Sequence, residues 1–201
     1  MNKLLMFVLF LGCFSCKKSF NSESEFYRWL NEGGNGFVVS KEAGVLKMEM
    51  KYLPPEYLVF KEFGSIQDLP SERKDSLLGL YNNSLSFLLK IGYKDPEHGD
   101  LLKNAVENYA EYSEMLMELN FQLNDYFSLH FDGQKTSPVL AKMEDSYGLQ
   151  PHRTIYLVFP KPEKSLSDDM KIVFTDYLFS TGITKFSFDH NKISDIPEFH
   201  F

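Results

Sequence analysis

Alternation of apolar and charged side chains over residues 45–53 limits the folds open to this chain more than any other feature. The apolar positions are Leu46, Met48, Met50 and Tyr52, and the charged positions between them are Lys47, Glu49 and Lys51. A repeat of two predicts a β-strand with one buried face and one solvated face. Residues 37–40 precede it across a connection that contains Gly44, so we expect the two segments to form a hairpin.

Several other short segments show apolar residues at every second position or are apolar throughout. We expect strands at residues 84–93, 126–131, 138–144, 154–159, 170–174 and 184–189. Polar turns that contain glycine or proline separate most of them, and no alternation of strand and helix typical of a parallel sheet is present. We expect the tail after these strands, with Ile193 and Phe199, to fold back against the core.

Helical spacing of apolar residues appears in four places. Short helices are expected at residues 26–30, 56–63 and 71–81, the last of them capped by Ser71. The longest is expected from Asp100 to about Leu123, because one apolar stripe follows a single helix face. That stripe is Ala105, Tyr109, Tyr112, Leu116, Leu119 and Leu123. The sequence therefore predicts an α+β fold: a mainly antiparallel β-sandwich of about seven or eight strands with one long and two or three short helices.

The N-terminal segment carries an uncharged apolar run at residues 4–14, followed by Ser15, Cys16 and two lysines. The run is far shorter than the ~20 residues of a membrane-spanning helix and is typical of a secretory signal peptide. A small residue before a cysteine at this place resembles the lipobox of bacterial lipoproteins, and the Ser-Cys-Lys-Lys start is similar to lipoproteins of Bacteroidota. Cys13, after residues 10–12, is the alternative site, and an ordinary cleaved signal or a short uncleaved anchor are the other interpretations.

The resemblance implies cleavage before Cys16 and attachment of a diacylglycerol and a further acyl chain, such as palmitate. Residues 1–15 would then be the signal peptide, residues 16–35 the lipidated cysteine with a tether and a short helix, and residues 36–201 a single globular domain. The implied location is the bacterial cell envelope, and we expect the outer membrane, on its periplasmic or surface side. Both cysteines of the chain precede residue 17, so disulfides and cysteine chemistry are excluded from the domain.

The net charge and the lack of known catalytic motifs argue against several classes of function. The formal net charge is −7, and no basic stripe is present, which argues against nucleic acid as a partner. The sequence contains no P-loop, no Gly-x-Ser-x-Gly, no His-Glu-x-x-His and no dinucleotide-binding glycine motif. We therefore expect no catalytic residues of a recognisable class and no cofactor.

The densest group of polar side chains lies in the loop at residues 95–100. Asp95, Glu97, His98 and Asp100 are the only candidates for a divalent metal site, and the alternative is ordinary turn and capping chemistry, which we favour. Asp168, Asp169 and Asp176 are candidates for an acid–base pair that hydrolyses sugars. The aromatic residues Tyr126, Tyr147, Tyr156 and Trp29 are candidates for a glycan-binding or protein-binding platform. The alternative is a place in the core or on the sheet face for those in strands, and the cover of a hydrophobic edge for Trp29.

These observations favour a membrane-anchored envelope lipoprotein that is not an enzyme and binds a protein partner or a glycan. A lipid-anchored hydrolase that acts on envelope polysaccharide or peptidoglycan through paired carboxylates is the first alternative. A structural protein of the immunity or inhibitor type, which blocks another protein, is the second. A cleft with converging carboxylates would favour the hydrolase, whereas an aromatic patch or a free strand edge would favour binding.

Overall fold

The computed structural model describes residues 18–64, 68–144, 150–162 and 169–200. Within these ranges the strands are β1 (Ser19–Phe20), β2 (Val38–Ala43), β3 (Leu46–Leu53), β4 (Ser84–Tyr93), β5 (Phe127–Phe131), β6 (Gln134–Thr136), β7 (Leu140–Met143), β8 (His152–Pro160), β9 (Met170–Asp176), β10 (Gly182–Phe188) and β11 (Glu198–Phe199). The α-helices are α1 (Glu23–Asn31), α2 (Pro55–Phe63), α3 (Ser71–Asn82), α4 (Leu101–Asn104), α5 (Tyr109–Phe121) and α6 (His190–Ser194), and two short 3-10 helices are η1 (Pro96–His98) and η2 (Leu123–Tyr126).

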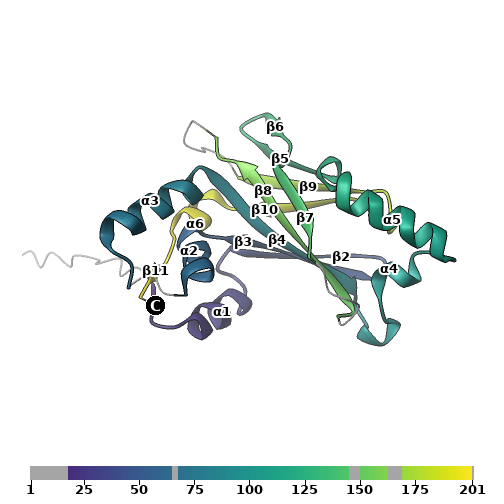
Figure 1. Ribbon diagram of the computed structural model, residues 1–201, viewed down its shortest axis with the longest axis horizontal. Helices are drawn as coiled ribbons and strands as arrows, with labels where there is room; N and C mark the ends of the chain where they lie inside the picture. The colour runs from purple at the N-terminus through teal and green to yellow at the C-terminus, as the bar shows by residue number, and fades with distance from the viewer. Residues whose placement is uncertain (1–17, 65–67, 145–149, 163–168, 201) are drawn as a thin grey trace, which may run out of the picture.

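The strands form two antiparallel sheets and one small parallel pair (Figure 1). The larger sheet has the order β2-β3-β4-β8-β7, and the smaller has the order β10-β9-β5-β6. The remaining two strands, β1 and β11, pair in parallel near the two ends of the chain. The expected α+β class with a dominant antiparallel sheet is confirmed.

One continuous core lies between the inner faces of the two sheets. Phe87 of β4 and Phe188 of β10 belong to different sheets, and their ring centroids lie 5.2 Å apart. On the smaller sheet, the rings of Phe127 and Phe174 stack at 4.9 Å. Because the described domain has no cysteine, burial of these aromatic and aliphatic side chains replaces cross-linking as the source of stability.

The hairpin of β2 and β3 follows directly from its sequence. Ala43 pairs with Leu46 across a turn in which Gly44 has a φ of 56°, a conformation that glycine adopts without steric cost. The alternating apolar residues of β3 are buried, as the repeat of two predicts. Pro55 then begins α2, and Gly64 ends it in the left-handed conformation.

The helix expected from Asp100 to Leu123 is wrong, because the chain forms two helices there. After α4, the side chain of Asn108 accepts a hydrogen bond from the Glu111 backbone N–H and begins α5 anew. The restart changes the phase of the helix, so Tyr109, expected on the buried face, is 82 % exposed. The expected cap at Ser71 is also wrong, since Pro70 precedes α3 without a side-chain cap.

The segments before β2 and after β10 are part of the folded body. β1 pairs with β11, and the side chains of Phe20 and Phe26 are buried in the main core, so the described part of the expected tether belongs to the domain. Trp29 lies inside this aromatic group, with its ring centroid 5.3 Å from that of Phe20. The tail folds back as expected, because Ile193 and Phe199 are buried.

Candidate functional site

A hollow on the outer face of the larger sheet is the best candidate for a binding site. It lies at the end of β4 and encloses about 190 Å³. That is room for several water molecules or for one small polar molecule. The residues that line it are Lys47, Glu49, Lys90, Gly92, Tyr93, Pro96, Pro151 and His152.

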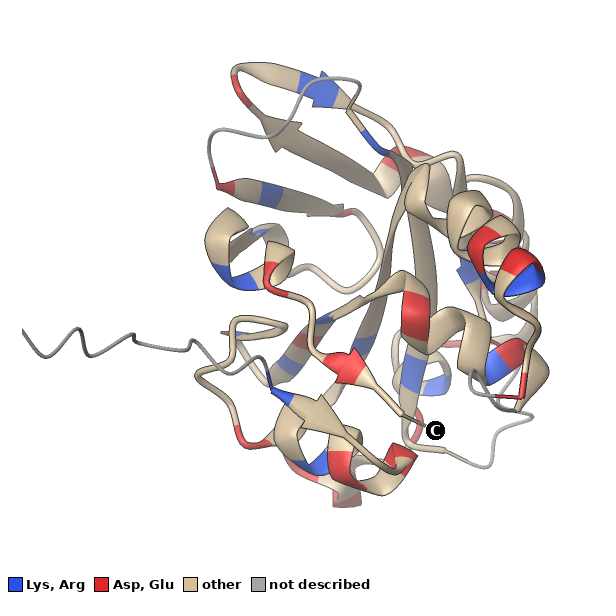
Figure 2. Ribbon diagram, turned by 90° about the vertical axis from the view of Figure 1, so that its left-hand side faces the viewer, with Lys and Arg blue, Asp and Glu red and all other residues tan. Residues whose placement is uncertain are grey.

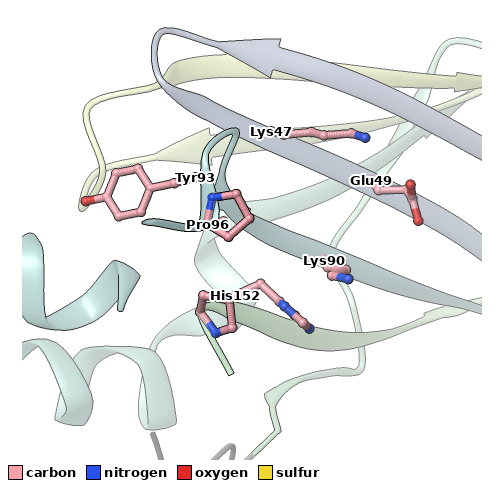
Figure 3. Close-up of a pocket in the computed structure, with 8 residues that line it drawn as sticks. Lys47, Glu49, Lys90, Tyr93, Pro96 and His152 are labelled. Carbon is pink, nitrogen blue, oxygen red and sulfur yellow. The ribbon is translucent and has the colours of Figure 1, made fainter. Parts of the chain in front are cut away.

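Strand register places three of these residues in one row. Lys47 of β3 pairs with Gly92 of β4, and Gly92 pairs in turn with His152 of β8. The next outward-facing row joins Glu49 to Lys90. Figure 3 shows the side chains of both rows on neighbouring strands, with Pro96 beside them. Segments more than a hundred residues apart in sequence thus meet at one end of the sheet.

Gly92 makes the hollow possible. A Cβ atom at this position would lie 2.9 Å from the Cβ of His152 and 3.2 Å from its Cα, which is closer than real Cβ contacts. Any side chain here would push His152 away and fill the space between the strands. The glycine in the middle of the row therefore keeps the floor of the hollow open.

The wall of the hollow is built by the turn that follows β4. The ring of Tyr93 stacks on the imidazole of His98, with centroids 5.3 Å apart and planes at 30°. Between them, the Asp95 side chain accepts a hydrogen bond from the Glu97 backbone N–H and begins η1. The turn places Pro96 beside the floor of charged side chains, whereas the ring of Tyr93 points away from Lys47 and Lys90 (Figure 3).

The electrostatics of the hollow are positive. Glu49 is paired with Lys51 at 3.0 Å, whereas Lys47 and Lys90 have no carboxylate within ion-pair distance in the part of the chain that the structure describes. Burial lowers the pKa of His152, and the positive charges of Lys90 and Arg153 lower it further. Glu42 lies opposite Lys47 on β2, and the charge of Lys47 contributes, after that of Lys94, to lowering the Glu42 pKa. The lining itself has two lysines against the single carboxylate Glu49, so in a chain of net charge −7 it is locally positive and can attract an anion.

A buried ion pair between Arg153 and Asp100 connects the two segments that line the hollow. The guanidinium of Arg153, 4 % exposed, donates to the carboxylate of Asp100 and to the backbone carbonyls of Gln150 and His152. Burial alone would raise the pKa of Asp100, but hydrogen bonds from the Lys103 backbone N–H and from Arg153 outweigh it and lower that pKa. The pair ties the loop after β4 to the start of β8, the two segments that form the walls.

The polar group at residues 95–100 serves the structure rather than a metal. Asp100 caps α4, as the sequence predicts, by accepting hydrogen bonds from two backbone N–H groups. The structure brings Asp95 near His98, with Oδ2 and Nδ1 3.6 Å apart, but turns Asp100 away toward Arg153. Across the ranges that the structure describes, no three His, Cys, Asp or Glu side chains gather in a way that could hold a metal ion.

The carboxylates proposed for sugar hydrolysis do not meet in one cleft. Asp176 is 7 % exposed and accepts hydrogen bonds from three backbone N–H groups and a hydroxyl in the turn after β9. Asp169 lines a second, more open hollow beside Asp132, and Asp168 lies outside the described residues. Asp176 therefore shapes a turn and is not available as an acid–base group.

The second hollow, at the β5–β6 hairpin, contains an imidazole next to a hydroxyl. The Nε2 atom of His130 lies 2.9 Å from Oγ of Ser128, which is the distance of a base from a nucleophile. Burial lowers the pKa of His130, with Lys135 and Lys185 adding to the effect. However, Ser128 is 8 % exposed on the sheet face, so its oxygen is not open to a substrate.

The tyrosines and the tryptophan do not form an exposed platform. Tyr126 is buried and donates a hydrogen bond to Glu118, while the hydroxyl of Tyr156 bonds Ser86 on the sheet. Trp29 contacts the aromatic core, and Tyr147 lies outside the described residues. Tyr126 thus lies in the core, and Trp29, which is half-buried, packs against it.

The residues of the hollow were not singled out from the sequence. The charged face of β3 was visible as Lys47, Glu49 and Lys51, but its meeting with Lys90 and His152 depends on a register that no local pattern contains. Cys16 and Cys13 lie outside the described residues, and no helix in the described ranges is long and apolar enough to span a membrane. Comparisons with protein-family models, with curated proteins and with solved structures found no match, so the geometry of the hollow carries the functional argument.

Proposed function

We propose that the protein is a lipid-anchored binding protein of the bacterial cell envelope, not an enzyme, that holds acidic sugar units in the hollow of the larger sheet. One observation carries the proposal: Lys47 and Lys90 line the same hollow, and within the described residues neither has a carboxylate at ion-pair distance. Lysines donate charge-assisted hydrogen bonds to carboxylates, and the rings of Pro96, Pro151 and His152 line the hollow, where a sugar ring can pack. A uronic acid or another carboxylate-bearing sugar combines both features.

The same geometry disfavours the hydrolase alternative. Cleavage of a glycosidic bond by paired carboxylates needs two such groups facing each other at a defined separation. The hollow is lined by a single carboxylate, Glu49, and Lys51 holds it in an ion pair. Binding without chemistry is therefore the function that the site supports best.

Acidic sugar binding gives a sharp test with the two lysines. For the full chain titrated with an oligogalacturonate, we expect Lys47→Ala with Lys90→Ala to weaken binding by at least about tenfold, because two charge-assisted hydrogen bonds are lost. Isothermal titration calorimetry measures the change. The matched control is Lys171→Ala with Lys185→Ala, which removes the same charge from exposed positions on the smaller sheet and should leave the affinity unchanged.

Two further titrations test whether the carboxylates of the ligand and the protonation of His152 contribute to binding. The methyl-esterified oligosaccharide lacks the carboxylates and should bind far more weakly; equal binding would contradict the proposal. A bound anion favours the protonated form of His152, whose pKa is lowered by burial and by Lys90, so the affinity should rise as the pH falls below about 6.5. His152→Gln should abolish that rise.

Attachment to the membrane is tested separately at the cysteine. Each buried methylene of an acyl chain contributes ~0.8 kcal/mol, so two or three chains hold a protein almost permanently. Acidic and basic residues are interspersed at the end of the molecule that carries β1 and α1 (Figure 2), so charge alone offers little attraction to anionic lipid.

We expect Cys16→Ser to release the protein from the membrane fraction and Cys13→Ser to leave it attached. Mass spectrometry of the mature N-terminus provides the measurement, with a lipid-modified Cys16 as the expected species. If only Cys13→Ser lost its attachment, the lipidated residue would be Cys13 and not Cys16. An unmodified N-terminus near Lys17 would contradict lipid attachment altogether.

A further inference from the structure

The outward side of α5 carries large apolar side chains that the core does not use. Phe121 is 84 % exposed and Met117 is 57 % exposed, and Tyr109 stands at the beginning of the same helix. We call these three residues the α5 surface. Other exposed apolar side chains, such as Val45 and Ile183, belong to separate strands or turns, whereas the α5 surface gathers three on one element.

A hollow adjoins this surface at the N-terminal end of α5. It is a shallow, open depression of about 320 Å³ between α4 and α5. The residues that line it are Lys103, Val106, Glu107, Asn108, Tyr109 and Tyr112. Binding interfaces often place one large side chain of a partner in such a recess, with exposed apolar contacts around it.

The rim of the α5 surface is acidic. Glu107, Glu111 and Glu114 are exposed on or just before α5, and Lys103 is the single cation of the adjoining hollow. The backbone N–H of Glu107 and the side chain of Asn108 both donate to the Glu111 carboxylate, which keeps that charge fixed at the start of the helix. An apolar centre with a negative rim is complementary to a basic surface.

We propose that the α5 surface docks a basic protein segment that inserts an apolar anchor beside Tyr109. A second copy of this chain is disfavoured, because a two-fold contact centred on the middle of α5 would bring Glu114 close to its own copy and offer no cation to the acidic rim. An anionic membrane does not fit either, for the same reason of charge. Figure 1 shows α5 at the end of the long axis opposite to β11, the strand that pairs with β1.

The test uses two labelled helical peptides with the same leucine and tryptophan stripe, one flanked by lysines and the other by glutamates. Fluorescence anisotropy with the full chain should show binding of the basic peptide and none of the acidic one. Phe121→Ser with Met117→Ser should weaken binding by about tenfold. Ile183→Ser, at an equally exposed position on β10, should have no effect.

A second pair of variants separates local charge from net charge. Glu107→Lys with Glu114→Lys should abolish binding of the basic peptide, whereas Glu72→Lys with Asp75→Lys, the same change on exposed positions of α3, should not. Equal losses in both pairs would overturn the proposal, since net charge would then explain them. Binding of the acidic peptide, or a dimer in sedimentation that Phe121→Ser dissolves, would overturn it as well. Thermal unfolding of every variant verifies that the fold is kept.

Discussion

Asp100→Asn is expected to lower the free energy of unfolding by about 3 kcal/mol, because it leaves the guanidinium of Arg153 buried without its counter-charge. Asparagine still caps a helix well, so the loss reports the ion pair and not the cap. Asp100→Ala should cost about 1 kcal/mol more, since the cap of α4 is lost too. Urea unfolding at neutral pH, followed through the fluorescence of Trp29, gives these values.

Asp95→Asn is the matched control, because Asp95 also caps a short helix but contacts only the exposed His98. It should change stability by less than about 0.5 kcal/mol. The pKa of Asp100 is lowered in the folded state, so its contribution is present above the unfolded pKa of about 3.9 and is lost as the pH falls through the folded value. The gap between wild type and Asp100→Asn should therefore close in acid. A gap that persisted there would show that the charge is not the cause.

Phe87→Ala is expected to destabilise the protein by about 3–5 kcal/mol, the usual range for removing a fully buried ring. Phe87 is 0 % exposed, and its ring lies 5.5 Å from that of Tyr52 and 5.2 Å from that of Phe188 on the facing sheet. The cavity would open between the two sheets, and neither sheet can fill it without moving relative to the other. The same urea unfolding measures the loss.

Phe121→Ala removes the same number of atoms from the exposed α5 surface and should change stability by less than about 0.5 kcal/mol. A small loss at Phe87, comparable to that at Phe121, would mean that the sheets do not pack across this ring. Because both variants replace a phenylalanine by alanine, the difference between their stability losses reports the effect of burial alone. They also provide a folded, stable variant for the docking experiments.

The parts of the fold that the sequence predicted are those in which local physics decides the outcome. The alternation on β3 and the turn at Gly44 are sufficient for the hairpin, and Pro55 and Gly64 set the bounds of α2. The three strands that were not expected, β1, β6 and β11, are two or three residues long, which is too short for any periodicity to appear.

The sequence contains a signal for the break between α4 and α5, but the regular spacing of apolar residues across the break pointed to one continuous helix. Asn108 followed three residues later by Glu111 is a capping arrangement, and the structure uses it. The apolar stripe crossed this point because Ala105 and Tyr109 happen to keep the spacing of a continuous helix. A local cap thus outweighed a pattern that extended over many residues.

The candidate site was beyond the reach of the sequence for a different reason. Lys47, Lys90 and His152 come from three strands, and only their register brings them into two adjoining rows. Gly92 creates the hollow by lacking a side chain, which in the sequence looks like an ordinary weak point in a strand. By contrast, the turn and capping role of residues 95–100 was foreseeable, because aspartate, proline and glycine act through their nearest neighbours.

The parallel pair of β1 and β11 has a consequence for the order in which the protein matures. Ser19 pairs with Glu198 and Phe20 with Phe199, so the first strand completes its hydrogen bonds only after the last strand has been synthesised. While the chain is being synthesised, β1 therefore remains without its partner strand. Pairing of β1 with β11 is thus a late event in folding.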